Sequence, residues 1–259
     1  MKKKKKYKRQ QKAYYFNTSI EIERTYTGNY GARGKKRQKR AKPTEEQIAK
    51  QNQYNREKNL RRILKANFVE DDHWVLLTYL KGYRTDISQS KKDFKKFYRM
   101  LRREYRKRGY ELKWVVRTEV GKRGAAHHHF LANRIPDGDV LIKNCWRKIK
   151  GAGFPSFKHT HEEGGFAGLA WYLTKPPDNK GMEHNYSRSR NLVIPEPEIT
   201  RTTKKEILEY PIPPEGYYID PDSVNMGTNP ITGHEYQHFI AYKIGTNAPQ
   251  WLTGRGGDG

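Results

Sequence analysis

The stretch Tyr110–Asn133, YELKWVVRTEVGKRGAAHHHFLAN, contains the pattern that decides the fold. β-branched and aromatic residues dominate its first part, up to Glu119, and such residues favour strands. The following GKRG (121–124) is typical of a turn, and the run AAHHHFLAN after it favours a second strand. The stretch therefore predicts an antiparallel hairpin whose second strand carries three consecutive histidines, His127–His129.

The histidine triplet places two imidazoles on one face of that second strand. Side chains alternate between the faces of a strand, so His127 and His129 share a face and His128 points to the other. The Cα atoms of the outer two histidines are about 7 Å apart, twice the rise per residue. Both imidazoles can therefore reach one cation.

Glu119 is a candidate third ligand. The turn length pairs Glu119 with Ala125, and Arg117 then pairs with His127, so that Glu119 lies on the face of the outer histidines. Two imidazoles and one carboxylate leave positions open for substrate oxygens on Mg²⁺ or Mn²⁺. The shared face is a hypothesis, because a loop that differs by one residue flips one strand relative to the other. In the alternative interpretation, the histidines are surface residues of an edge strand.

Two residues of AWYLTKPP (170–177) are candidates for catalysis. Tyr172 and Lys175 are three residues apart in a predicted helix and therefore share a face. A tyrosine hydroxyl is a poor nucleophile at its ordinary pKa of about 10, but a nearby ammonium group and a metal-polarised phosphate make it effective. The spacing alone is weak, because the chain contains 18 tyrosines. In the alternative interpretation, Tyr172 is an aromatic residue that packs a helix.

The flanking segments alternate between predicted strands and helices. Strands are predicted over His73–Gly82 and, weakly, over 154–161. Helices are predicted over Pro43–Asn67, which opens with Thr44 and Gln47 in capping-box spacing, over Ser90–Gly109, over 138–153 and over 164–177. Two of these helices have residues that we expect to face a core: Phe94, Phe97, Leu101 and Tyr105 in one, and Val140, Leu141, Cys145 and Ile149 in the other. Hairpins with helices on one side predict an α+β sandwich with a mainly antiparallel sheet.

Composition and charge restrict the class of protein. Of 259 residues only 34% are hydrophobic, and the net charge is +25, so some segments must be solvated or bound to a partner of opposite charge. Lys and Arg mixed with many aromatic residues suit nucleic acid. No apolar run approaches the roughly 20 residues of a membrane span, so we expect no membrane partner. The single cysteine, Cys145, excludes an internal disulfide framework and favours a cytoplasmic setting.

The chain divides into three predicted segments. Residues 1–42 are basic and poor in aliphatic residues, which predicts a flexible arm that either solubilises the protein or binds nucleic acid. Residues 43–200 contain the predicted strands and helices with the candidate site. Residues 201–259 form an extension of uncertain structure. We expect the arm and the Lys/Arg face of Ser90–Gly109 to supply sequence-independent contacts to DNA, although the sequence leaves open which of them touches it.

Three stretches in order resemble the motifs of rolling-circle replication initiators of the HUH endonuclease superfamily. They are WVLLTY (74–79), EVGKRGAAHHHFLAN (119–133) and YLTK (172–175). His128 is a departure, because the middle position of the His-hydrophobic-His motif is usually apolar or aromatic. The resemblance covers about residues 70–200, and Tyr172 lies 43 residues after His129. It points to the branch with a single catalytic tyrosine; Tyr186 is a conceivable second tyrosine without a lysine partner.

The resemblance implies a fold and an activity. The fold is a ferredoxin/RRM-like antiparallel sheet whose central strands carry the histidines. His127, His129 and Glu119 bind a divalent metal, Mg²⁺ or Mn²⁺. Tyr172, assisted by Lys175, attacks a DNA phosphate at a replication origin, which leaves a 5′-phosphotyrosine and a free 3′-OH that primes synthesis. The partners are single-stranded DNA, a host or separate helicase and a DNA polymerase, in the cytoplasm of a bacterium that carries a plasmid, phage or integrated element.

Other functions are open on the sequence. Relaxases and single-strand transposases use the same chemistry, and a nucleic-acid-binding module without catalysis also explains the charge. HEYQH (234–238) matches the His-Glu-x-x-His pattern of zinc metalloproteases, with Glu235 as general base. That pattern requires a helix, and the segment alternates like a strand as readily. A third zinc ligand is also missing, because the only acidic residue after His238 is Asp258.

Overall fold

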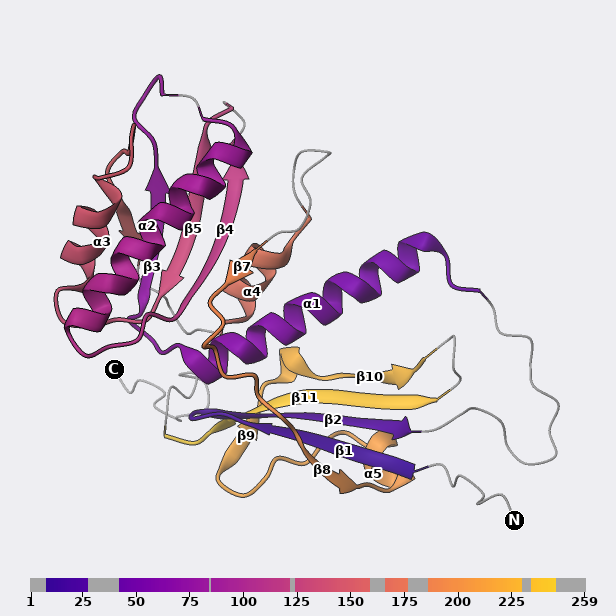
Figure 1. Cartoon of the computed structure of the whole chain (residues 1–259). Coiled ribbons are helices and arrows are strands. Elements are labelled where there is room, and N and C mark those ends of the chain that lie inside the picture. Colours follow the sequence, from indigo (N-terminus) through magenta and orange to yellow (C-terminus); the bar gives the residue numbers. More distant parts are fainter. Residues whose placement is uncertain are drawn as a thin grey trace, which may run out of the picture. The chain divides into compact units, whose positions relative to one another are not determined.

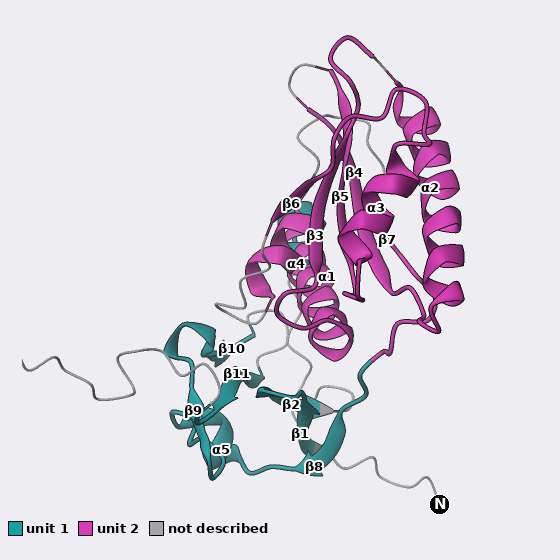
Figure 2. Ribbon diagram, turned by 90° about the vertical axis from the view of Figure 1, so that its left-hand side faces the viewer, with its two compact units in different colours: residues 1–47, 195–259 teal, residues 48–194 magenta. Residues whose placement is uncertain are grey.

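The computed structural model describes residues 8–27, 42–83, 85–121, 124–158, 166–176, 186–229 and 234–245. They form two compact units, residues 48–194 and residues 1–47 with 195–259 (Figure 1, Figure 2). Residues 48–194, which Figure 2 labels unit 2, lie within the predicted segment 43–200. In the described part of the chain, no helix combines the length and apolar character that crossing a bilayer requires.

Unit 2 is built on a five-stranded antiparallel sheet. The strands are, in spatial order, β6 (Ser156–Lys158), β3 (His73–Thr78), β5 (Ala126–Ala132), β4 (Trp114–Val120) and β7 (Ser187–Arg188). The predicted α+β class with an antiparallel sheet is confirmed. The histidine strand β5 is the central strand, so the interpretation of the histidines as residues of an edge strand is wrong.

Helices cover both faces of this sheet, as Figure 2 shows. α2 (Ile87–Lys107) and α3 (Gly138–Trp146) pack on one face, and α1 (Glu45–Asn67) and α4 (Ala167–Thr174) pack on the other. The expectation that helices lie on one face only is therefore wrong. The physical reason is that the central strands are apolar at consecutive positions: Val116 packs toward α2, while the adjacent Val115 packs toward α1 and α4.

The helices begin and bury residues largely as predicted. α1 starts with the capping box, in which the Gln47 N–H donates to Thr44 Oγ1 at 3.2 Å and the Thr44 N–H donates to Gln47 Oε1 at 3.0 Å. The predicted stripe of α2 is buried, as are Leu141, Cys145 and Ile149. Val140 is 45% exposed, so its expected place in the core is wrong. It lies next to Leu141 on a helix, where neighbouring residues point about 100° apart.

The other unit is a six-stranded antiparallel sheet. Its path runs β10 (Asn225–Thr228), β11 (Glu235–Lys243), β2 (Ser19–Thr27), β1 (Lys8–Tyr15) and β8 (Glu198–Arg201), and β9 (Tyr217–Ile219) also pairs with β11. The short helix α5 (Lys204–Leu208) and the 3₁₀ turn η1 (Pro221–Ser223) complete the described elements. The extension of uncertain structure thus contributes several strands of this sheet.

The predicted flexible arm needs correction over residues 8–27. These residues form a β1–β2 hairpin, and β2 pairs with β11 from the other end of the chain. Ala13 and Ile22 are opposite each other, and Ile22 is opposite Phe239, so a small apolar core holds the strands together. The sequence hid this because the partner strand is more than 200 residues away. Residues 1–7 and 28–41 lie outside the described residues.

Candidate metal centre and nucleophile

The β4–β5 hairpin sets the position of the candidate ligands. Glu119 is directly opposite His127, and Val120 is opposite Ala126. The predicted pairing of Glu119 with Ala125 is therefore wrong by two residues, because the turn is centred one residue later in the chain than predicted; in it, the Gly124 N–H donates to the Gly121 carbonyl at 2.8 Å. A shift of two residues preserves the face of every side chain. Glu119 and the outer histidines consequently do share a face.

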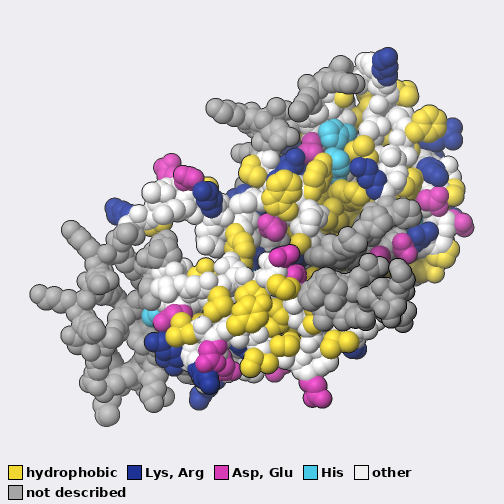
Figure 3. Space-filling model, turned by 180° about the vertical axis from the view of Figure 1, so that it is seen from behind, with side chains coloured by type: hydrophobic (Ala, Val, Ile, Leu, Met, Phe, Trp, Pro, Cys, Tyr) yellow, Lys and Arg dark blue, Asp and Glu magenta, His cyan; other side chains and the backbone are white. Residues whose placement is uncertain are grey.

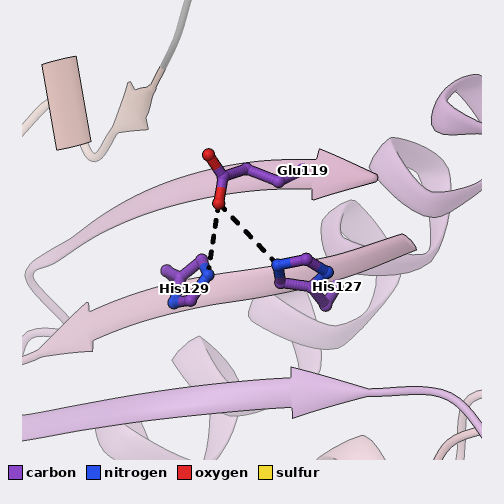
Figure 4. A group of neighbouring side chains, drawn as sticks. All are labelled: Glu119, His127 and His129. Carbon is purple, nitrogen blue, oxygen red and sulfur yellow. Dashed lines mark ion pairs between the residues drawn. The ribbon is translucent and has the colours of Figure 1, made fainter. Parts of the chain in front are cut away.

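The three candidate ligands converge on one point. Glu119 Oε2 lies 3.7 Å from His127 Nε2 and 3.3 Å from His129 Nε2 (Figure 4). One donor atom from each residue lies within 4.8 Å of the others. All three side chains are partly exposed, so a cation from solution has access to them. The arrangement is compatible with a divalent cation held by two imidazoles and one carboxylate.

Tyr172 reaches the same point from α4. Its hydroxyl lies 2.6 Å from His129 Nε2 and donates to Glu119 Oε2 at 3.0 Å. Trp74 of β3 supports both rings: it stacks on His129 with centroids 5.8 Å apart and meets Tyr172 edge-on at 6.3 Å. The Lys175 ammonium lies 5.2 Å from the centroid of the Tyr172 ring. All five residues predicted for the site are thus brought together.

Charges around Glu119 keep it ionised. Burial favours the neutral acid, but hydrogen bonds from His127 and His129, the Arg117 charge and the Tyr172 hydroxyl together hold the pKa of Glu119 well below its ordinary value. For His129, burial lowers the pKa despite the neighbouring Glu119. An ionised carboxylate and a neutral imidazole are the protonation states that bind a metal ion.

Arg117 is a site residue that sequence reasoning missed. The residue is 1% exposed, and its Nε donates to Glu119 Oε1 at 2.6 Å. Its Nη1 donates to the carbonyls of Tyr172, Leu173 and Lys175 at 3.2, 3.1 and 2.7 Å. One guanidinium therefore ties the carboxyl end of α4, which carries Tyr172, to the carboxylate of β4. The sequence did contain one signal. Arg117 and Glu119 are two residues apart on a predicted strand and so share a face, and a buried arginine requires a partner such as a carboxylate.

His128 belongs to the core on the opposite face. It is fully buried, its ring centroid is 5.3 Å from that of Phe94, and its Nδ1 lies 2.9 Å from Thr118 Oγ1. Burial, together with the nearby His127 and His129, lowers the pKa of His128 to about 3. The triplet is thus divided between two functions: two histidines face the candidate metal centre and one packs as a neutral ring.

This burial predicts a loss of stability in acid that His128→Gln removes. The unfolded histidine takes up a proton below about pH 6.5, whereas the folded one stays neutral down to about pH 3. The wild-type free energy of unfolding should therefore decrease as the pH is lowered through this window, by up to about 1.4 kcal/mol per unit more than that of the variant. Urea unfolding of both proteins in EDTA between these pH values measures the difference. If the free energies of unfolding of the two proteins change with pH in parallel, His128 is not held neutral in the folded state.

Two other predictions concern histidines and tyrosines elsewhere. His234 and His238 flank the start of β11, a strand, so the helical arrangement of a zinc metalloprotease is not formed. Instead, His238 Nε2 lies 2.9 Å from Glu21 Oε1 and His234 stacks on Tyr26. Tyr186 packs against the core under α1 and α4, where burial raises its pKa. The sequence contains a second His-x-His pair, His159 and His161, to which we assign no role; it lies outside the described residues.

Comparison with known proteins agrees with this geometry. Residues 72–177 match a family model described as replication-associated protein, ORF2 type. No curated protein and no solved structure matched the chain. The matched stretch includes β3, the β4–β5 hairpin and α4, and hence Glu119, both outer histidines, Tyr172 and Lys175. The family supports a role in DNA replication and, through it, contact with DNA. Residues 72–177 of this chain are therefore similar to that family of replication-associated proteins.

Proposed function

We propose that the protein is a metal-dependent endonuclease and strand transferase. It nicks single-stranded DNA at a replication origin and stays attached through a 5′-phosphotyrosine, which starts rolling-circle replication. The observation that carries this proposal is the position of the Tyr172 hydroxyl, 2.6 Å from His129 Nε2 and 3.0 Å from Glu119 Oε2. A tyrosine that only packed a helix would not need its hydroxyl among three candidate ligands. A host or separate helicase and a polymerase would then extend the free 3′ end in the bacterial cytoplasm.

The donor set fits a divalent cation. Glu119, His127 and His129 would hold Mg²⁺ or Mn²⁺, because their donor atoms converge and partly face solvent. When bound there, the cation would neutralise charge on the non-bridging oxygens of the scissile phosphate. Arg117 keeps Glu119 oriented for this, since it holds the other carboxylate oxygen at 2.6 Å.

The side chains of the chain itself account for the nucleophilic step. The phenol oxygen of Tyr172 forms a bond to phosphorus while the bond from phosphorus to the 3′ oxygen breaks. The phenol proton passes along its hydrogen bond to Glu119 Oε2 and on to solvent, and the 3′ oxygen takes up a proton from solvent to become a hydroxyl, so protons balance. The Lys175 ammonium, 5.2 Å from the centroid of the ring, places a positive charge beside the negative charge that develops during the attack. The phosphotyrosine conserves the energy of the bond for later rejoining.

A direct experiment tests the proposal. The full chain is incubated with a pool of single-stranded oligonucleotides of random sequence, labelled at the 5′ or the 3′ end, with Mn²⁺. We expect a covalent adduct that retains the 3′ label, because the protein attaches to the 5′ phosphate of the downstream fragment. The modified peptide should contain Tyr172. An adduct on a different residue, or one that retains the 5′ label, would contradict the proposal. A DNA-binding protein without catalytic activity would bind the oligonucleotides but form no covalent adduct.

Arg117 is expected to act as a positioning residue. Replacing Arg117 by Lys keeps a buried cation but loses the fork that joins Glu119 to the end of α4. We expect the single-turnover nicking rate to fall by about 10²-fold, because a shift of about 1 Å in a nucleophile has that effect. Affinity for single-stranded DNA should change less than about twofold, since Arg117 is buried. A purely structural role would instead lower the melting temperature and leave the rate per folded molecule unchanged.

A further inference from the structure

One helix of unit 2, α2, carries a continuous face of exposed lysine and arginine side chains. The α2 basic face consists of eight exposed residues: Lys91, Lys92, Lys95, Lys96, Arg99, Arg102, Arg103 and Arg106. None of them forms an ion pair with a residue in the described ranges; Glu104 pairs with Lys107 and Arg108 instead. Like charges at such spacing repel each other, which destabilises the free helix. A partner of opposite charge would relieve this repulsion.

The composition of this face selects among anionic partners. The aromatic side chains Phe94, Phe97 and Tyr105 of the same helix are buried in the core on its opposite side. The eight residues of the basic face include no aromatic ring, and the neighbouring Tyr98 is partly buried against Phe94 and Trp114. Proteins that grip single strands rely on exposed rings for stacking. The basic face also offers no apolar side chain to insert into a bilayer. Phosphates that are held in a regular row without exposed bases are those of a duplex.

The position of α2 separates this face from the candidate active site. α2 packs on one face of the sheet and α4, with Tyr172, on the other. In Figure 1 α2 lies in front of the sheet, and histidine side chains are visible from behind in Figure 3. A strand bound at Tyr172 therefore does not lie along α2. The two surfaces must contact different parts of a DNA molecule.

We propose that the α2 basic face binds the phosphate backbone of double-stranded DNA that flanks the single-stranded segment at the candidate site. From Lys91 to Arg106 the face is about 22 Å long, and duplex DNA presents on the order of a dozen phosphates over that length. Contacts to phosphates position a protein without reading sequence. The flanking role rests on the proposed nicking function, whereas duplex binding by α2 does not.

The test compares two variants of equal charge. The first carries Lys92→Gln, Lys96→Gln and Arg103→Gln, which lie in one row of the α2 basic face. The control carries Lys81→Gln, Arg190→Gln and Lys205→Gln, three exposed residues elsewhere. Fluorescence anisotropy measures the affinity of each protein for a short duplex and for a single strand of the same sequence, between about 50 and 200 mM salt.

We expect the α2 variant alone to lose duplex affinity. The slope of log affinity against log salt should decrease in magnitude by about 2 to 3, since each lost phosphate contact accounts for about 0.9. Affinity for the single strand and nicking of a short single-stranded substrate should stay within about twofold of wild type. Nicking of a substrate with an adjacent duplex should fall at moderate salt. If no nicking is found at all, the proposed function fails while the duplex comparison still stands.

Four results would overturn the inference. Wild-type duplex affinity and salt slope in the α2 variant would show that the face does not bind duplex DNA. An equal loss in the control would show an effect of net charge only. A larger loss for the single strand than for the duplex would assign the face to single strands. A loss of binding to phosphatidylserine vesicles with unchanged duplex binding would assign it to a membrane surface.

Discussion

Replacing Tyr172 by Phe should abolish nicking and the covalent adduct, with a loss in rate of about 10⁴-fold or more. The substitution removes only the hydroxyl. The ring remains supported by Trp74 and Lys175, so affinity for single-stranded DNA should change by less than about twofold. Denaturing gels with end-labelled oligonucleotides measure the adduct and the nick, and filter binding measures the affinity.

Tyr186→Phe is the matched control for this experiment. Tyr186 is partly buried against the core under α1 and α4, and no ligand of the candidate metal centre is among its described contacts. This variant should nick at the wild-type rate. If Tyr186→Phe loses the adduct and Tyr172→Phe retains it, the nucleophile has been assigned to the wrong residue. If both variants nick DNA and form the adduct at the wild-type rate, the nickase proposal is untenable.

The double substitution His127→Gln and His129→Gln should remove the metal dependence together with the activity. Only Glu119 of the three converging donors would remain, so the affinity for Mn²⁺ should fall by about 10²-fold or more. Even residues that only hydrogen-bond to metal ligands contribute about 10- to 100-fold to metal affinity. Nicking should fall to background, and DNA should still bind. Electron paramagnetic resonance of free Mn²⁺ measures the affinity without reference to activity.

His128→Gln is the control within the same triplet. His128 faces the core, where its Nδ1 contacts Thr118 Oγ1, so this variant should bind Mn²⁺ as the wild type does. Unchanged Mn²⁺ affinity in the double variant would show that the outer histidines are not ligands. Nicking by the wild type at full rate in excess EDTA would likewise remove the need for a metal.

Local pattern predicted much of unit 2. The alternation of side chains placed Glu119 and the outer histidines on one face, and it placed His128 on the other. The assignment of side chains to faces stayed correct although the predicted register was wrong by two residues, because side chains on a strand alternate with a period of two. Two predictions failed: Val140 is exposed, because it points about 100° away from the buried Leu141, and helices cover both faces of the sheet.

Non-local pairing was not predictable in the same way. The strands β1 and β2 are too poor in aliphatic residues to stand out, and their stability depends on β11 at the other end of the chain. Arg117 could be interpreted as a charged residue on a strand, but its partners are carbonyls of a helix more than 50 residues later. Such contacts leave no periodic trace in the sequence.

By itself, the sequence determined which side chains share a face, because backbone geometry fixes that over a few residues. It also determined the excess of positive charge and the basic face of α2. Only the tertiary structure decided that Tyr172, 43 residues after His129, brings its hydroxyl to within 2.6 Å of that imidazole. The reason is that this distance depends on how α4 packs on the sheet and on the contacts of Trp74 and Arg117, which join segments far apart in the chain.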